Sequence, residues 1–319
     1  MARTVKLNFC DLAPDWDPRD NYFTRALKHH GWTIDFDSEP DFVLCGTFGH
    51  DFLRYDCVRI QYSGEDSWPD LNLYDYAMGF PLLDYDGRYL RLPLYALRDT
   101  WAPALARHTL PDEAFLRRRG FCSFVVSNDF SAERNAFFAA LDARRGVASG
   151  GGYRNNVGGP VADKQSFLRD YKFNIAYENS ASPGYCTEKI VDAFAAGAVP
   201  IYWGDPEICG EFNPGAFLWA GAYPDTESLL ARLDEIDKNE AEYLSICHTP
   251  ILREGCRAAR YVDDRACVEF LERIFAAGPA ALRRNRSCWG TIYENDLKYR
   301  LSLTQPPKGF LTRLREKFR

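Results

Sequence analysis

The sequence predicts an α/β protein with parallel sheets, divided into two domains. Apolar runs typical of buried strands alternate with helix-like stretches, and this alternation occurs in two successive series along the 319 residues. The break between the series is a charged stretch containing a proline, residues 108–120, which we interpret as a linker. Hydrophobic residues make up 46% of the chain, which is enough material for two cores.

The individual elements follow from the apolar runs and from the glycines between them. In the first series, strands are expected at 5–10, 41–46, 57–65 and 76–80, with a helix at 19–31 that ends at a glycine. In the second series, strands are expected at 121–128, 173–180 and 198–204, with helices at 132–146 and 187–197. Two more helical stretches follow at 227–248 and 263–278.

Composition disfavours several classes of protein. The net charge of −6 gives no reason to expect nucleic acid as a partner. Ten cysteines occur without a C-x-x-C pair, so we expect free thiols and no metal site. The chain has no run of eighteen apolar residues and no apolar signal region at its start, so we expect a cytoplasmic protein.

The C-terminal tail is strongly basic. Residues 298–319 contain seven Lys or Arg and one Glu, which gives this segment a charge of +6. Apolar residues recur there at helical spacing, so one face would be apolar and the other basic. Such a helix can lie on an anionic membrane through residues 308–319, at the inner face of the cell membrane, or it can pack back on the body. Both interpretations remain open.

Polar groups gather where a buried strand ends and a helix begins. Glu178 and Asn179 end the strand, and Thr187, Glu188 and Lys189 start the helix. In an open parallel sheet, the carboxyl ends of strands and the amino ends of helices border one crevice. The helix start and Lys189 would together attract an anion, most naturally a phosphate, with another charge compensating the lysine. The alternative is a solvated first turn.

The stretch 172–204 resembles the donor-site signature of the α-1,3-fucosyltransferases, the family that transfers fucose from GDP-fucose. Its features are a strand ending in E-N-S, the run Y-x-T-E-K, a helix, and V-P-x-x-x-G. Residues 62–95 are similar to the acceptor-side block of the bacterial members, and 121–138 to the first strand and helix of their donor domain.

This resemblance implies a GT-B fold, in which two Rossmann-like domains face a central cleft. Residues 1–115 would bind the acceptor, 116–285 the GDP-sugar, and 286–319 would cross back to the first domain. The implied activity is an inverting transfer of L-fucose to a GlcNAc or Glc hydroxyl of an oligosaccharide or lipopolysaccharide, with α-1,3 linkage. No cofactor is required, although Mn²⁺ or Mg²⁺ can stimulate by binding the diphosphate.

The resemblance also assigns roles to residues. Glu65 matches the G-E position of the catalytic base, and we expect it to be partly buried at a strand tip. Asp66 stands where the family usually has Asn. Arg134 and Lys189 would neutralise the departing diphosphate, and Glu188 would accept hydrogen bonds from sugar hydroxyls as the second catalytic carboxylate. The complete donor-binding set is Asn128, Arg134, Glu178, Asn179, Tyr185, Thr187 and Lys189.

Other motifs have simpler interpretations. Glu65 could merely cap its own turn, and Arg134 could be a solvated helix residue. The glycine-rich loop 149–159 does not match G-x-G-x-x-G, and we interpret it as flexible and close to the guanine. Asp84–Gly87 reads as a turn and Asp263–Asp264 as a helix start, so neither predicts a metal site.

Other functions remain as alternatives. A transferase of the same fold could use another GDP-sugar or make an α-1,4 linkage. A glycan-binding protein without catalytic activity is less favoured because the candidate catalytic residues are present. A Rossmann oxidoreductase is disfavoured because no glycine fingerprint follows the first strand.

Overall fold

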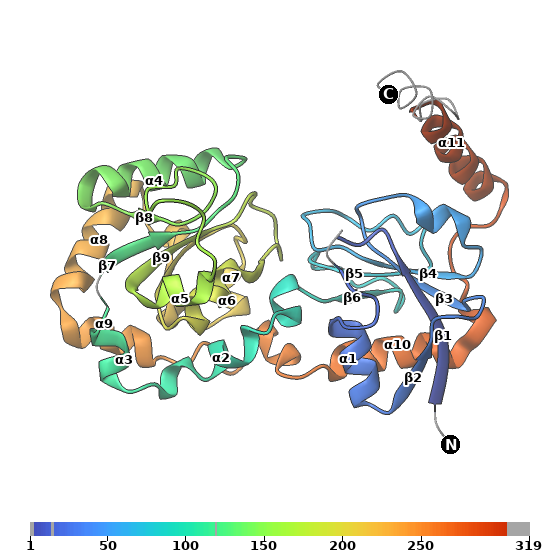
Figure 1. Cartoon of the computed structure of the whole chain (residues 1–319), viewed down its shortest axis with the longest axis horizontal. Helices are drawn as coiled ribbons and strands as arrows, with labels where there is room; N and C mark the ends of the chain where they lie inside the picture. The colour runs from blue at the N-terminus through green and yellow to red at the C-terminus, as the bar shows by residue number, and fades with distance from the viewer. Residues whose placement is uncertain (1–2, 14–15, 119, 305–319) are drawn as a thin grey trace, which may run out of the picture.

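The computed structural model describes residues 3–13, 16–118 and 120–304, which form two domains lying side by side (Figure 1). Each domain is built on a parallel sheet, as predicted. The first sheet consists of β1 (Arg3–Cys10), β2 (Trp32–Asp35), β3 (Phe42–Cys45), β4 (Val58–Tyr62), β5 (Tyr76–Gly79) and β6 (Tyr89–Arg91), in the order β2-β1-β3-β4-β5-β6. The second sheet consists of β7 (Gly120–Phe124), β8 (Ala148–Ser149), β9 (Tyr171–Tyr177), β10 (Val199–Trp203) and β11 (Leu218–Trp219), in the order β11-β10-β9-β7-β8.

Helices cover both faces of the second sheet. They are α4 (Ala132–Arg145), α5 (Lys164–Arg169), α6 (Glu188–Ala195), α7 (Ile208–Glu211), α8 (Thr226–Lys238) and α9 (Glu240–His248). On β9, Phe173 and Ile175 join the core beneath α4 and α8, whereas Ala176 joins the core beneath α6. Because successive strand residues point to opposite faces, the apolar run of β9 serves both layers.

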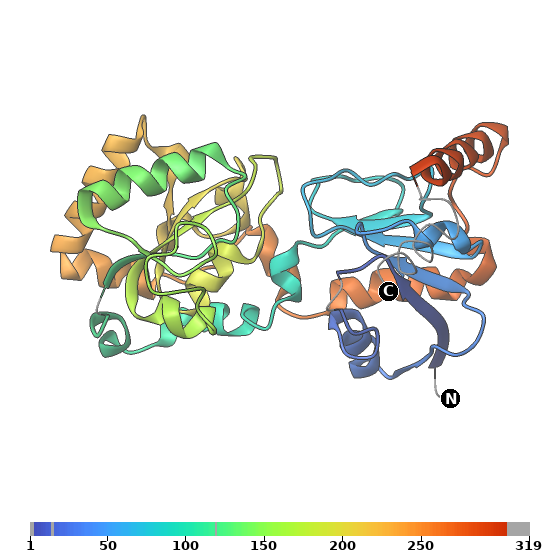
Figure 2. The same cartoon turned by 45° about the horizontal axis from the view of Figure 1, so that its top comes forward.

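Within the described residues, the chain crosses between the domains twice (Figure 2). After β6 it passes to α2 (Trp101–Leu105), which packs on α6, and to α3 (Asp112–Leu116), which packs on α9. It returns before α10 (Arg265–Ala277), which lies with α1 (Tyr22–His29) against the first sheet. The ring of Phe275 lies 5.5 Å from that of Trp32. The return therefore begins before residue 286, and α2 and α3 lie against the second domain although α2 and most of α3 come before residue 116.

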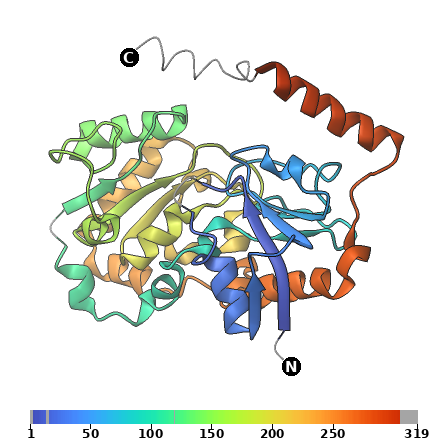
Figure 3. The ribbon, with the colours of Figure 1, turned by 45° about the vertical axis from the view of Figure 1, so that its right-hand side comes forward.

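The last described helix, α11 (Cys288–Thr304), projects from the first domain (Figure 3). It is anchored by Glu294, which accepts hydrogen bonds from the buried Arg59 at 3.0 and 3.2 Å. Within the described ranges, no helix combines the length and apolar character needed to span a membrane. The predicted membrane-binding segment 308–319 lies outside the described residues.

Acid should weaken the anchoring of α11. Burial acts to raise the pKa of Glu294, but Arg59 and Lys298 outweigh it and lower the pKa to about 2. A folded-state pKa below the unfolded value of about 4.3 stabilises the protein above that value, and the gain is lost as pH falls towards 2. Urea unfolding should show Glu294→Gln to be less stable than wild type at pH 7. The difference should shrink at pH 3, and a difference that stays constant would contradict the assignment.

Candidate functional site at the carboxyl ends of the second sheet

The candidate site forms at the point where the strand order of the second sheet reverses. The chain runs from β7 to β8 in one direction, and from β9 through β10 to β11 in the other. The switch point therefore lies between β7 and β9, and such points are where open α/β sheets bind ligands. The loop after β7 contains Asn128, and the loop after β9 begins with Glu178 and Asn179.

Arg134 joins these two loops. It lies in the first turn of α4, where its N–H donates to the side chain of the N-cap residue Ser131. Its Nη1 donates to Asn179 Oδ1 at 2.5 Å, and its Nη2 donates to the carbonyl and Oδ1 of Asn128 at 2.9 and 3.0 Å. The side chain is buried, so it is neither a solvated helix residue nor an open fork. Its buried Nε has no hydrogen-bond partner among the described residues.

A second cluster joins the end of β9 to the start of α6. Glu178 is fully buried, and it accepts hydrogen bonds from the backbone N–H and the hydroxyl of Thr187, each at 2.7 Å. Lys189 Nζ donates to Glu178 at 2.9 Å and to Thr187 Oγ1 at 2.9 Å. Glu178 thus supplies the charge expected to compensate Lys189. Burial acts to lower the pKa of Lys189, but Glu178 and Glu188 outweigh it and raise the pKa.

The side chain of Thr187 does not cap α6. It occupies the N-cap position, but its hydroxyl contacts Glu178 and Lys189, and no side chain caps the helix. Thr187 therefore supplies no acceptor to the amide groups of the first turn of α6. This leaves the positive end of the helix dipole available to an anion.

Glu188 is the first residue of α6 and is partly exposed. Burial acts to raise its pKa, but Lys189, Lys164 and its own backbone N–H outweigh it and lower the pKa to about 2. At neutral pH it is therefore a carboxylate, which can accept hydrogen bonds or stabilise positive charge but cannot donate a proton. Lys164, which pairs with Asp192 at 2.7 Å, was not predicted from the sequence.

The first domain contributes the loop after β4. Glu65 is exposed there, in contrast to the expected partial burial, and its carboxylate makes no hydrogen bond or ion pair with any other described residue. The adjacent Asp66 reaches the second domain, where its Oδ2 accepts hydrogen bonds from Ser180 at 2.5 Å and Ser182 at 2.6 Å. Glu65 and Asp66 both contribute to the raised pKa of Tyr185, behind the larger effects of burial and Glu178, so this loop lies near the site.

Two further contacts hold the loop between β9 and α6 against the first domain. Tyr185, predicted to bind the donor, is buried, and its ring lies edge-on to Phe80 at 4.9 Å. Arg91, at the end of β6, donates to the carbonyl of Gly184 at 3.0 Å and pairs with the buried Glu211 at 2.9 Å. Gly184 has a φ of +85°, and a Cβ there would lie 2.5 Å from the Phe80 carbonyl. The sequence did not predict this role of Arg91, and the one feature that could have indicated it is a charged residue within an apolar run.

Of the remaining motifs, the loop 149–159 borders the site and the other two have structural roles. The loop 149–159, predicted to be flexible, contains hydrogen bonds from Asn155 to the Gly151 carbonyl and from the Gly159 N–H to Asn155, at 2.9 and 2.8 Å. Asp86 and Gly87 form a turn with positive φ. Asp264 starts α10, and its carboxylate contacts two histidines at the end of α1.

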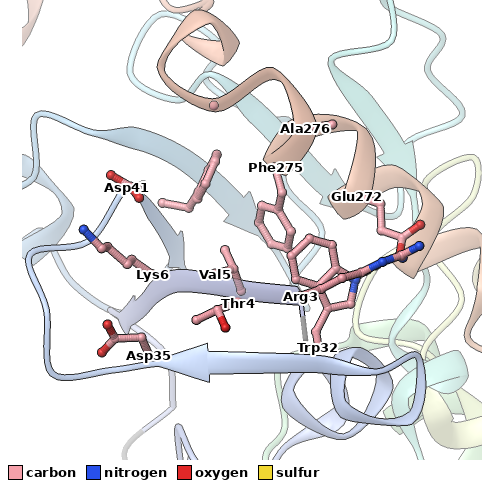
Figure 4. A pocket seen from close by; sticks show the side chains of 12 residues that line it. Arg3, Thr4, Val5, Lys6, Trp32, Asp35, Asp41, Glu272, Phe275 and Ala276 are labelled. Carbon is pink, nitrogen blue, oxygen red and sulfur yellow. Dashed lines mark hydrogen bonds and ion pairs between the residues drawn. The ribbon is translucent and has the colours of Figure 1, made fainter. Parts of the chain in front are cut away.

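The cavity of about 790 Å³ in Figure 4 lies elsewhere, beside the amino-terminal half of β1. Trp32, Phe275 and Glu272 line it together with Arg3. Ligands of open parallel sheets bind outside the carboxyl ends of the strands. We therefore place the candidate site at the β7–β9 switch point rather than in this cavity.

Comparison with known families agrees with this architecture. Residues 7–98 match the family model "Alpha-(1,3)-fucosyltransferase FucT N-terminal domain", and residues 116–248 match "Glycosyltransferase family 10 (fucosyltransferase) C-term". The chain is similar to alpha-(1,3)-fucosyltransferase FucT of Helicobacter pylori, with 36% identity over 221 residues, which is 60% of this chain and 46% of that protein. It is also similar to mouse alpha-(1,3)-fucosyltransferase 4, with 37% identity over 133 residues, 40% of this chain and 30% of that protein. The chain thus spans less than half the length of either relative.

Solved structures extend the similarity to most of the chain. A crystal structure of an alpha1,3-fucosyltransferase with GDP-fucose shares 27% identity and a TM-score of 0.72, over 86% of this chain and 91% of that chain. A further structure of an alpha1,3-fucosyltransferase gives 28% identity and a TM-score of 0.74, over 86% and 90%. The fold is therefore GT-B, as predicted. Because the two matching family models describe the two halves of one enzyme family, this chain belongs to glycosyltransferase family 10, the fucosyltransferases.

Proposed function

We propose that this protein transfers L-fucose from GDP-fucose to a GlcNAc or Glc hydroxyl of a glycan, with inversion and formation of an α-1,3 linkage. Family membership supports the proposal, as does the similarity to a fucosyltransferase solved with GDP-fucose. The alternatives of another GDP-sugar or an α-1,4 linkage stay within the same chemistry. The geometry gives no specific support to a glycan-binding protein without activity, or to an oxidoreductase.

The observation that carries the proposal is the set of unused donors at the β7–β9 switch point. The Nε of Arg134 is buried without a hydrogen-bond partner among the described residues. Lys189 uses two of its three N–H donors within the described structure, and no side chain caps α6. The guanidinium of Arg134, the ammonium of Lys189 and the amino end of α6 thus all follow the two strands that border the switch point, and groups of this kind bind diphosphates.

In the proposed reaction, Glu65 takes the proton of the acceptor hydroxyl as its oxygen forms a bond to the anomeric carbon of fucose. The bond from that carbon to the diphosphate breaks on the opposite face, and its electron pair leaves with GDP. Arg134, Lys189 and the α6 dipole stabilise the charge that develops on the leaving group. The ionised Glu188 accepts hydrogen bonds from the sugar and favours its transient positive charge.

The neighbouring residues position this donor machinery. Glu178 and Thr187 fix the ammonium of Lys189, while Asn128 and Asn179 fix the guanidinium of Arg134. Tyr185 acts through its packing on Phe80, which keeps the loop in place. A divalent ion such as Mn²⁺ or Mg²⁺ is not required in this proposal, although it can assist by binding the diphosphate.

We further propose an oligosaccharide or lipopolysaccharide acceptor and a cytoplasmic location, peripheral on the inner face of the cell membrane. The support for membrane association is the +6 charge of residues 298–319. It can be tested by sedimenting the protein with anionic and neutral vesicles.

The test of function is GDP release in the presence of a defined acceptor. The protein should release GDP from GDP-fucose faster than from GDP-mannose, and only the fucose donor should yield a fucosylated glycan. Offering Galβ1-4GlcNAc and Galβ1-3GlcNAc separately, with linkage analysis of the products, distinguishes α-1,3 from α-1,4 transfer. Turnover of GDP-mannose alone would refute the proposed donor.

A further inference from the structure

Asp66 makes a direct hydrogen-bonded connection between the two domains beside the proposed active site. A single carboxylate oxygen accepts from Ser180 at 2.5 Å and from Ser182 at 2.6 Å, across 114 and 116 residues of sequence. Asp66 belongs to the loop after β4, and the two serines belong to the loop after β9. We call this connection the Asp66 clasp.

On the first-domain side, the clasp adjoins Glu65 within a tightly bonded loop. The Ser63 hydroxyl donates to the Glu65 carbonyl at 3.1 Å and lies 2.7 Å from the Ser67 hydroxyl. The Ser67 N–H donates to the same carbonyl at 2.8 Å. The backbone of Glu65 is therefore fixed on both sides, and Asp66 sets where this loop stands relative to the second domain.

On the second-domain side, the clasp adjoins the donor cluster. Ser180 directly follows Glu178 and Asn179, which contact Lys189 and Arg134. A few backbone bonds therefore separate each end of the clasp from a proposed reacting group. Among the described residues, no other hydrogen bond joins the Glu65 loop to this segment.

We propose that Asp66 is a positioning residue, which holds Glu65 at the distance from the donor cluster that proton removal and bond formation require. This role rests on the proposed function. Carboxylate–hydroxyl hydrogen bonds are short and stronger than neutral ones, which suits a contact that joins two domains. Loss of about 1 Å of alignment between reacting groups can cost about 10²-fold in rate.

The clasp can be removed without dismantling the interface. Phe80 still packs on Tyr185, and Arg91 still holds Gly184 and Glu211. The loop after β9 therefore keeps its other supports when Asp66 is replaced. A fall in rate would then report lost alignment rather than a lost fold.

The test is a mutant cycle that combines Asp66→Ala with the double variant Ser180→Ala/Ser182→Ala. We expect each to lower kcat about 10- to 100-fold, with GDP affinity and Tm close to wild type. The combined variant should be no slower than Asp66→Ala alone, because both changes break the same clasp. Asp66→Asn should retain most of the rate, since its amide oxygen can accept the same two bonds. Asp84→Ala, an exposed loop aspartate, is the matched control and should behave as wild type.

Two results would overturn the proposal. Losses that multiply in the combined variant would show that Asp66 and the serines act independently. An unchanged kcat in Asp66→Ala would show that alignment does not depend on the clasp. A wild-type protein that does not consume GDP-fucose would refute the proposed function and this role together, whereas an active wild type with multiplying losses would refute this role alone.

Discussion

Replacing Glu65 by glutamine should lower kcat for fucosyl transfer by about 10²–10⁴-fold, the range that a general base contributes. The amide keeps the size of the side chain but cannot accept a proton. Because Glu65 is exposed and its carboxylate makes no hydrogen bond or ion pair with other described residues, the change should leave the fold and GDP binding intact. Steady-state kinetics with saturating GDP-fucose, together with calorimetric titration of GDP, measure both effects.

The control for this prediction is Glu39→Gln, which alters an exposed glutamate on the turn between β2 and β3. It makes the same change in charge but should not affect the rate. Normal turnover by Glu65→Gln would mean that another group removes the proton. A parallel loss of GDP affinity would instead place Glu65 in donor binding.

Replacing Lys189 by methionine should both destabilise the protein and abolish transfer. Glu178 would be left fully buried without its cation, and removal of one partner of a buried ion pair typically costs about 3–5 kcal/mol of unfolding free energy. The diphosphate would also lose a stabilising charge. Urea unfolding and GDP-release assays on the same preparation measure the two effects.

A double variant separates these two contributions. In Glu178→Gln/Lys189→Met neither member of the pair carries a charge. The glutamine oxygen can accept from the Thr187 N–H, and its amide group can donate to the Thr187 hydroxyl, so part of the stability should return while transfer stays absent. Lys172→Met breaks a more exposed pair with Asp237, 2.8 Å long, and should cost about 1 kcal/mol or less. If activity recovered along with stability in the double variant, Lys189 would have only a structural role.

The sequence predicted the central strands of both sheets, because each is an apolar run of at least four residues bounded by polar or glycine residues. It did not predict the edge strands β2, β6, β8 and β11, three of which have only two or three residues. Such short strands carry too little periodicity to be told from loops, and they form because a longer neighbour offers its backbone groups.

The candidate site also has a part that the sequence predicted and a part that it did not. Glu178, Thr187 and Lys189 lie within twelve residues of one strand–helix unit. Their closeness in the sequence is why their proximity in the fold could be predicted. The burial of Arg134 and the reach of Asp66 to Ser180 depend on how separate segments pack. No local pattern encodes those contacts, and Asp66 stands out in the sequence only because it replaces the Asn that is usual in the family.

Because α10 returns to the first sheet, the two domains can complete their cores at different times as the chain emerges from the ribosome. Phe270, Leu271 and Ile274 belong to the core of the first sheet, yet they are synthesised after the whole second sheet. The second domain can therefore close its core while the first still exposes apolar surface, a condition that favours aggregation or chaperone binding. The domain made first is thus the one finished last.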